Sequence, residues 1–177
     1  MKAARKGIVL ALVHIALIGT LGAKLMIDRS RYPRVWAKSV PFDPDLPIRG
    51  RYVRLRLEAN ADAPFTAKEE EKHLYRDSPA GFGRIYRNAD LMVRDGALIA
   101  VPNDEGQTAV QAIIGQEDRA QLTVPVAFFI PEHVPDPSMR PAGEELWVEV
   151  TVPAKGPPRP IQLGVKKDGT IVPLGLR

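Results

Sequence analysis

The chain has 177 residues, 25 of them Lys or Arg and 21 Asp or Glu, and it contains no Cys. The missing thiols exclude structural disulfides, a thiolate metal site, a Cys nucleophile and a lipidated Cys anchor. Eight basic residues but only one acid, Asp28, lie in residues 1–38, so the rest of the chain carries 17 basic and 20 acidic side chains, a balance that argues against a nucleic-acid-binding domain.

An apolar run of membrane length lies near the N-terminus. It spans residues 7–23, and Lys24 can extend its stem to the interface so that the span continues to residue 27. Three basic residues precede it: Lys2, Arg5 and Lys6. Because positive charge before a span favours the cytoplasmic side, we predict a transmembrane helix or signal-anchor at residues 1–27. The protein would then be single-pass in the inner (plasma) membrane, with its C-terminal domain periplasmic or otherwise extracytoplasmic.

Two alternatives for this run remain open. A cleaved signal peptide has the same charged start and short apolar core, but Thr20 and Gly22 fit a cleavage site only tolerably and a basic stretch follows. A buried core helix is the other alternative. We therefore expect the helix to be retained as an anchor.

Small residues share one face of the predicted span. Ala16, Gly19, Thr20 and Ala23 are spaced i, i+3, i+4, i+7, a pattern that lets another membrane helix approach closely but that is also common near the end of signal-like segments. His14 lies near mid-span, and a neutral imidazole is tolerated there more easily than a charge. The face with Ala16, Gly19 and Ala23 is a candidate contact with a polytopic membrane protein.

Residues 28–38 read as a linker that runs into the first strand of an extracytoplasmic β-domain, residues 39–177. Trp36 fits two positions equally well, the membrane surface, where aromatic residues are favoured, or the start of the domain core.

Period-two alternation of apolar and polar residues predicts strands in three places. In residues 51–58, Val53, Leu55 and Leu57 point one way, whereas Arg54, Arg56 and Glu58 point the other. The same pattern recurs at residues 122–130 and 146–152. Pro125 should place the second of these strands at an edge or mark a bulge. Residues 109–114 are a further short strand candidate.

Two Asp-Gly pairs predict hairpins, Asp95-Gly96 and Asp168-Gly169, because two-residue turns need the positive φ that these residues accept. Residues 60–88 read as an insertion between two strands. It contains a short helix at residues 66–75, where Thr66 and Glu69 form a capping box, and a loop at residues 76–88. The predicted fold is mainly β, a small antiparallel sandwich or open barrel with one helix insertion.

The segment at residues 41–57, PFDPDLPIRGRYVRLRL, resembles the signature of the GDYXXLXY family of membrane-anchored bacterial proteins. The matching positions are Pro41, Asp43, Pro44, Arg49, Gly50, Tyr52, Val53 and Leu55. Arg51 and Leu57 depart from it, replacing an Asp and a Tyr. FFIPE at residues 128–132 and the hairpin at residues 161–172 are also similar. The resemblance implies an extracytoplasmic domain that accompanies polytopic membrane proteins, with no assigned catalytic residue.

The motif also has a physical interpretation. Gly50 permits a bulge at strand entry. Tyr52 has the parity opposite to Leu55, so a bulge at residues 50–53 is needed to turn it into the core, where we expect it. A ligand-binding role for the same cluster is the alternative.

Motifs for catalysis or metal binding are not found. Glu132, His133 and Asp136 lie in a Pro-rich loop, and Glu69 and His73 are better read as a solvated helix face than as a zinc pair. The basic stripe of Arg49, Arg51, Arg54 and Arg56 could meet anionic head groups or simply be a wet sheet face. We predict no cofactor, no metal and no enzyme activity.

The predicted function is that of an accessory or interaction module for a membrane protein, with the bilayer as its other partner. The alternatives are a module that binds an envelope ligand or polymer and, less favoured, a periplasmic hydrolase. An exposed apolar patch or edge would favour the first, and a deep polar pocket with convergent carboxylates the last.

Overall fold

The computed structural model describes residues 2–41, 52–65, 83–113 and 116–175. The chain forms two compact units, Met1–Tyr32 and Pro33–Arg177. The first is one helix and the second is a β-domain, so the predicted mainly β architecture behind an N-terminal helix is confirmed.

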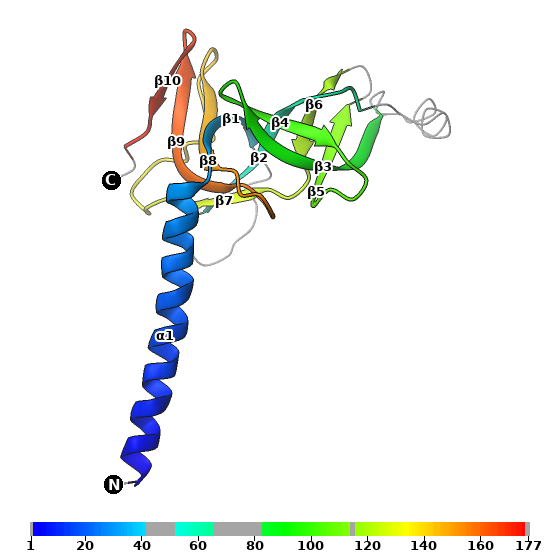
Figure 1. Cartoon of the computed structure of the whole chain (residues 1–177). Coiled ribbons are helices and arrows are strands. Elements are labelled where there is room, and N and C mark those ends of the chain that lie inside the picture. The colour runs from blue at the N-terminus through cyan, green and yellow to red at the C-terminus, as the bar shows by residue number, and fades with distance from the viewer. Residues whose placement is uncertain (1, 42–51, 66–82, 114–115, 176–177) are drawn as a thin grey trace. The chain divides into compact units, whose positions relative to one another are not determined.

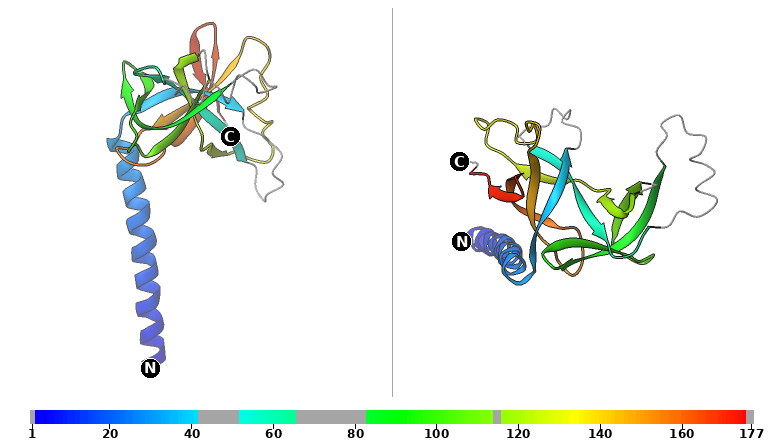
Figure 2. Two further views of the ribbon diagram at one scale, coloured as in Figure 1. Left: turned by 90° about the vertical axis from the view of Figure 1, so that its right-hand side faces the viewer. Right: turned by 90° about the horizontal axis from the view of Figure 1, so that it is seen from above.

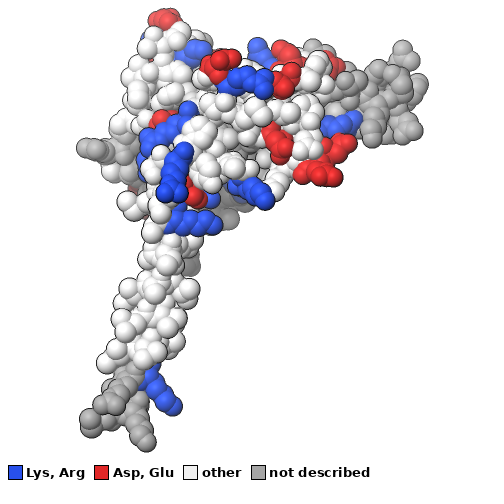
Figure 3. Space-filling view, viewed as in Figure 1, with Lys and Arg blue, Asp and Glu red and all other residues white. Residues whose placement is uncertain are grey.

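The helix α1 spans Lys2–Arg31. Its stretch Lys6–Arg31 is long and apolar enough to cross a membrane, and none of it is buried. The displayed face of the helix carries no charged side chain along most of its length (Figure 3). The Tyr32 amide donates to the Asp28 carbonyl at 3.0 Å, and Pro33 ends the helix because it cannot continue the hydrogen-bonding pattern. Strand β1 begins at Arg34, so the boundaries differ from the predicted linker at residues 28–38.

Ten strands follow in the described residues. They are β1 Arg34–Pro41, β2 Tyr52–Ala61, β3 Arg84–Arg94, β4 Ala97–Pro102, β5 Thr108–Ile113, β6 Gln116–Leu122, β7 Val126–Phe129, β8 Glu145–Thr151, β9 Arg159–Lys167 and β10 Thr170–Pro173.

Five of the strands close a barrel in the order β2-β4-β3-β5-β6 and back to β2. All of these pairings are antiparallel except β2–β4, where Asn60 pairs with Ile99 and Ala61 with Ala100 in parallel. From β2 the sheet continues through β1, β8, β9 and β10, with β7 also paired to β2. Figure 1 shows the β3–β6 and the β8–β10 strands on opposite sides of the domain, and Figure 2 shows β2 running between them.

Both predicted hairpins are present. Asp95 and Gly96 have φ of 52° and 72° and join β3 to β4, and Asp168 and Gly169 have φ of 49° and 81° and join β9 to β10. Positive φ at both central residues gives a turn whose twist matches that of the flanking strands. The local sequence therefore sets the register of both hairpins.

The predicted alternation also sets the core. Leu55, Leu57, Val148 and Val150 are fully buried, while Arg54 is exposed. The core combines side chains from the barrel and from the β1–β8–β9 sheet. This part of the strand assignment is confirmed.

Tyr52 is an exception to the predicted core. The structure leaves 56% of its surface exposed, because β2 is already a regular strand at Tyr52 and its burial alternates without a bulge through the following residues. Tyr52 thus keeps the parity of Arg54 and points outward. Gly50 and the start of the predicted bulge lie outside the described residues.

Pro125 divides the strand predicted at residues 122–130. β6 ends at Leu122 and β7 begins at Val126, while Val124 between them is 62% exposed. Proline lacks the N–H that a ladder needs, so pairing stops there. Both pieces still pair with β2. Strand β7 pairs with the part of β2 that contains Tyr52, and β6 pairs with the part that contains Glu58.

The insertion between β2 and β3 is shorter than the predicted residues 60–88, since β2 runs to Ala61 and β3 starts at Arg84. Phe65 is buried, and its amide donates to the Glu117 carbonyl at 3.2 Å. The predicted helix at residues 66–75 lies outside the described residues.

Candidate ligand groove

The sequence-predicted residues of the helix share an exposed face. Ala16, Gly19 and Ala23 are all exposed, and a Cβ added at Gly19 would meet nothing within 4 Å. His14 Nδ1 lies 2.8 Å from the Leu10 carbonyl oxygen; since a carbonyl only accepts, the ring donates from Nδ1. The Nδ1 of this imidazole is therefore bonded within its own helix.

On β2 the predicted residues divide between two faces. Leu55 is in the core, whereas Arg54 is exposed and Arg56 half-buried on the outer face. Arg49 and Arg51 lie outside the described residues, so the described part of the predicted basic stripe consists of Arg54 and Arg56.

An aromatic pair lies on the same outer face. Tyr52 pairs in register with Phe129 of β7, and their rings meet edge to face with centroids 5.5 Å apart. Both remain more than half exposed, at 56% and 57%. Among the described strands β7 pairs only with β2, so the pair lies at a sheet edge. We call Tyr52, Arg54 and Phe129 the β2–β7 patch.

A groove of about 430 Å³ opens elsewhere in the domain. One wall comes from β1 and β8 and holds both tryptophans of the chain. The other wall comes from β2, β6 and the turn between β3 and β4. The side chains that line the groove with polar or aromatic groups are Trp36, Lys38, Glu145 and Trp147 on the first wall and Glu58, Asn60 and Arg119 on the second.

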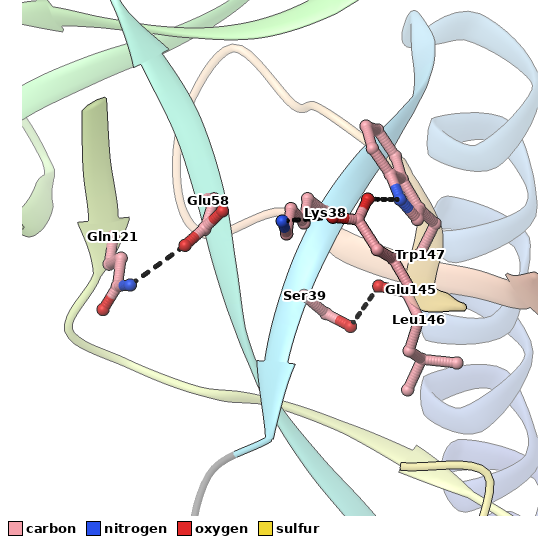
Figure 4. A network of polar contacts seen from close by, with 7 residues as sticks. All are labelled: Lys38, Ser39, Glu58, Gln121, Glu145, Leu146 and Trp147. Carbon is pink, nitrogen blue, oxygen red and sulfur yellow. Dashed lines mark hydrogen bonds and ion pairs between the residues drawn. The ribbon is translucent and has the colours of Figure 1, made fainter. Parts of the chain in front are cut away.

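An ion pair lies on the first wall. Lys38 Nζ lies 2.5 Å from Glu145 Oε1, and Trp147 Nε1 donates to Glu145 Oε2 at 3.2 Å (Figure 4). The hydrogen bond from Lys38 and then that from Trp147 lower the pKa of Glu145 below its ordinary value. Glu145 is therefore a carboxylate at neutral pH and is poorly suited to act as a general acid, which needs a raised pKa.

The carboxylate on the second wall is oriented by the barrel. Gln121 Nε2 donates to Glu58 Oε1 at 3.0 Å, and Gln111 Nε2 donates to Gln121 Oε1 at 3.0 Å (Figure 4 shows the first contact). Gln111 is almost fully buried. A chain of hydrogen bonds across β5, β6 and β2, on the face opposite to the core residues, thus fixes Glu58 at the rim of the groove.

Packing also fixes the tryptophans. A Cβ placed on Gly164 would lie 2.7 Å from Trp36 Cζ3, so the indole occupies the space that any larger residue would need. Lys166 Nζ lies 4.6 Å from the centroid of the Trp147 ring, within the range of a cation–π interaction. The Ser39 hydroxyl donates to the Leu146 carbonyl at 2.9 Å and holds β1 against β8 (Figure 4).

The predicted metal alternatives find no support in the described residues, where no group of three His, Asp or Glu is placed to hold an ion. Asp136 Oδ1 instead accepts from the Ser138 amide at 2.8 Å, a local bond that shapes the loop. The helix pair Glu69 and His73 lies outside the described residues.

Sequence reasoning missed the groove. A usable signal was present, because each tryptophan stands between two core residues: Trp36 between Val35 and Ala37, and Trp147 between Leu146 and Val148. Strand parity therefore puts both indoles on the outer face of their strands. That these outer positions meet at one groove follows only from the β1–β8 pairing, in which Lys38 faces Trp147.

Comparison with protein-family models, curated proteins and solved structures gave no match for this chain. The resemblance to the GDYXXLXY family stays a prediction.

Proposed function

We propose that this protein is a single-pass membrane protein whose extracytoplasmic domain acts by association with a membrane-protein partner. The exposed, apolar helix α1 supplies the anchor, and the basic residues before it favour a cytoplasmic N-terminus. The resemblance to membrane-anchored proteins that accompany polytopic partners points the same way.

The observation that carries this proposal is the β2–β7 patch. Tyr and Arg are among the residues that contribute most to protein interfaces, and Tyr52, Arg54 and Phe129 lie together and exposed at a sheet edge. Because exposed aromatic side chains at an edge are costly to leave in water, a partner surface is the simplest reason for them.

Site-specific photocrosslinking in intact membranes tests the proposal. We place p-benzoylphenylalanine at Phe129 and, as a matched control, at Tyr86, which is equally exposed on β3 at 55%. We expect an adduct with an integral membrane protein from position 129 only, and its loss in Arg54→Glu. Identical adducts from both positions would contradict a role for the patch.

A second test addresses the helix. Replacing residues 7–27 by an all-Leu span keeps the anchor but removes the face of Ala16, Gly19 and Ala23. If the helix face contributes to association, co-purification of the crosslinked partner falls. If only the patch contributes, co-purification is unchanged while Arg54→Glu still abolishes it.

The groove favours a second candidate function, binding of an envelope ligand or polymer. Its volume lies in the range of small-molecule sites. Glu145, one of its two carboxylates, has a lowered pKa and is therefore not suited to be the general acid of a hydrolase. A retaining or inverting glycosidase needs one carboxyl group that stays protonated.

A further inference from the structure

We propose that the groove binds a neutral saccharide chain, with one sugar ring stacked on the tryptophan wall and its hydroxyls bonded by the opposite wall. This inference rests on the second candidate function and names the ligand class for it. Three features of the groove favour this ligand: its aromatic wall, its polar wall and its balance of charge.

The aromatic wall suits the apolar face of a pyranose ring. The ring C–H groups of a sugar form a flat apolar face, and an indole offers a large rigid surface to match it. Trp36 is held against Gly164 and Trp147 is held by its bond to Glu145. Because the protein has already fixed these rings, little conformational entropy is lost when a ligand stacks on them.

The polar wall suits sugar hydroxyls, each of which both donates and accepts. Glu58 offers carboxylate oxygen as an acceptor, Arg119 offers donors and Asn60 offers both. Among the described residues no hydrogen bond is found for the Asn60 side-chain amide, and the contact found for the Arg119 guanidinium is the one of 4.0 Å from Nε to Asp118, with 63% of the Arg119 side chain exposed. These groups are therefore available at the groove.

The four charged side chains that line the groove balance one another, and a fifth charge, Lys166, lies beside the groove over the Trp147 ring. Lys38 and Arg119 are positive, Glu58 and Glu145 are negative, and Lys38 and Glu145 are already paired. An anionic polymer or a phosphate would face two carboxylates, and a cationic ligand would face two basic groups. A neutral ligand with many hydroxyls meets donors and acceptors of both kinds without such repulsion.

The two tryptophans make the test selective. Since the chain has no other tryptophan, its indole fluorescence reports only from the groove. The full chain is kept in a polyoxyethylene detergent, which contains neither indole nor sugar. The neutral probes are hexamers of N-acetylglucosamine, glucose in β-1,4 linkage and glucose in α-1,4 linkage, and the anionic probe is polygalacturonate.

We expect a neutral hexamer to shift the tryptophan emission and to protect the indoles from acrylamide quenching. Its affinity should change less than about twofold between low and high salt, because no counterions are released. Asn60→Ala should weaken binding about three- to tenfold, as expected for one lost hydrogen bond. Trp147→Phe, which keeps a ring, should weaken it less than Trp147→Ala. Tyr86→Ala, an exposed aromatic residue outside the groove, is the matched control and should leave the affinity unchanged.

The inference is overturned if no neutral hexamer alters the emission at millimolar concentration, or if polygalacturonate binds more tightly and does so in a salt-dependent way. An equal loss of affinity in Tyr86→Ala and Asn60→Ala overturns it as well. Circular dichroism of each variant separates lost binding from lost fold. The crosslink from position 129 does not involve the groove, so its presence or absence tests the partner proposal separately.

Discussion

Trp36 on β1 and Gly164 on β9 pack against each other across the strand that separates them, β8. A Cβ at position 164 would come within 2.7 and 2.8 Å of two indole carbons and 3.0 Å of Ile171 Cγ2. The close approach requires glycine because the ring rests where any other side chain would begin.

Gly164→Ala should therefore displace the Trp36 ring and destabilise the domain by about 1–3 kcal/mol, the usual range for overpacking. In a Trp147→Phe background Trp36 is the only tryptophan, so the indole emission maximum and its quenching, excited selectively at long wavelength, report the displacement directly. Gly175→Ala is the control, because a Cβ there meets nothing within 4 Å. Unchanged Trp36 emission in the Gly164 variant would show that the indole does not rest on this glycine.

Leu55→Ala should lower the free energy of unfolding by about 2–5 kcal/mol, because it removes a fully buried side chain from the centre of β2. Arg54→Ala, the neighbouring exposed position, should change it by less than about 0.5 kcal/mol. Denaturant unfolding of the full chain in detergent, followed by circular dichroism, measures both. Equal effects would contradict the assignment of Leu55 to the buried face of β2 and Arg54 to the exposed face.

Glu145 should make stability depend on pH in the acid range. Its pKa is lowered in the folded state, so its contribution is complete above the ordinary value of 4.5 and is lost as the pH falls through the lower folded-state value. The pair is partly exposed, with side-chain exposures of 35% and 42%, so the effect should stay below about 1 kcal/mol.

The measurement is the difference in melting temperature between the native protein and Glu145→Gln at pH 7 and at pH 3. We expect the native protein to be the more stable at pH 7 and the difference to shrink at pH 3 and in high salt. Glu105→Gln, at an exposed turn position, should show no such pattern. A difference that grows on acidification would contradict the ion pair as described.

The helix α1 should remain attached, with its N-terminus in the cytoplasm. Because the chain has no Cys, single-Cys variants give unique labels. Met139→Cys, at a side chain 79% exposed, should react with a membrane-impermeant maleimide in cells whose outer membrane is permeabilised and whose plasma membrane is intact. Ala3→Cys should react only after the cells are lysed. N-terminal sequencing of membrane-extracted protein completes the test. A mature chain that starts near Ala23 or Lys24 would show that the span is a cleaved signal.

Several features follow from the sequence alone because they depend on neighbouring residues. The apolar run makes a membrane-length helix, the Asp95-Gly96 and Asp168-Gly169 turns make hairpins, and alternation in β2 and β8 makes the core faces. Pro125 also acted locally, because it separates β6 from β7, and among the described strands β7 pairs only with β2.

Other features were decided by tertiary structure because they depend on pairings between distant segments. The parallel contact of Asn60 with Ile99 closes the barrel, and no local pattern encodes that partner. Tyr52 points outward because its pairing with Phe129 keeps β2 regular there. Trp36 and Trp147 share a groove because β1 pairs with β8. Sequence periodicity fixes which side of a strand a residue takes, but only the sheet order determines which residues it meets there.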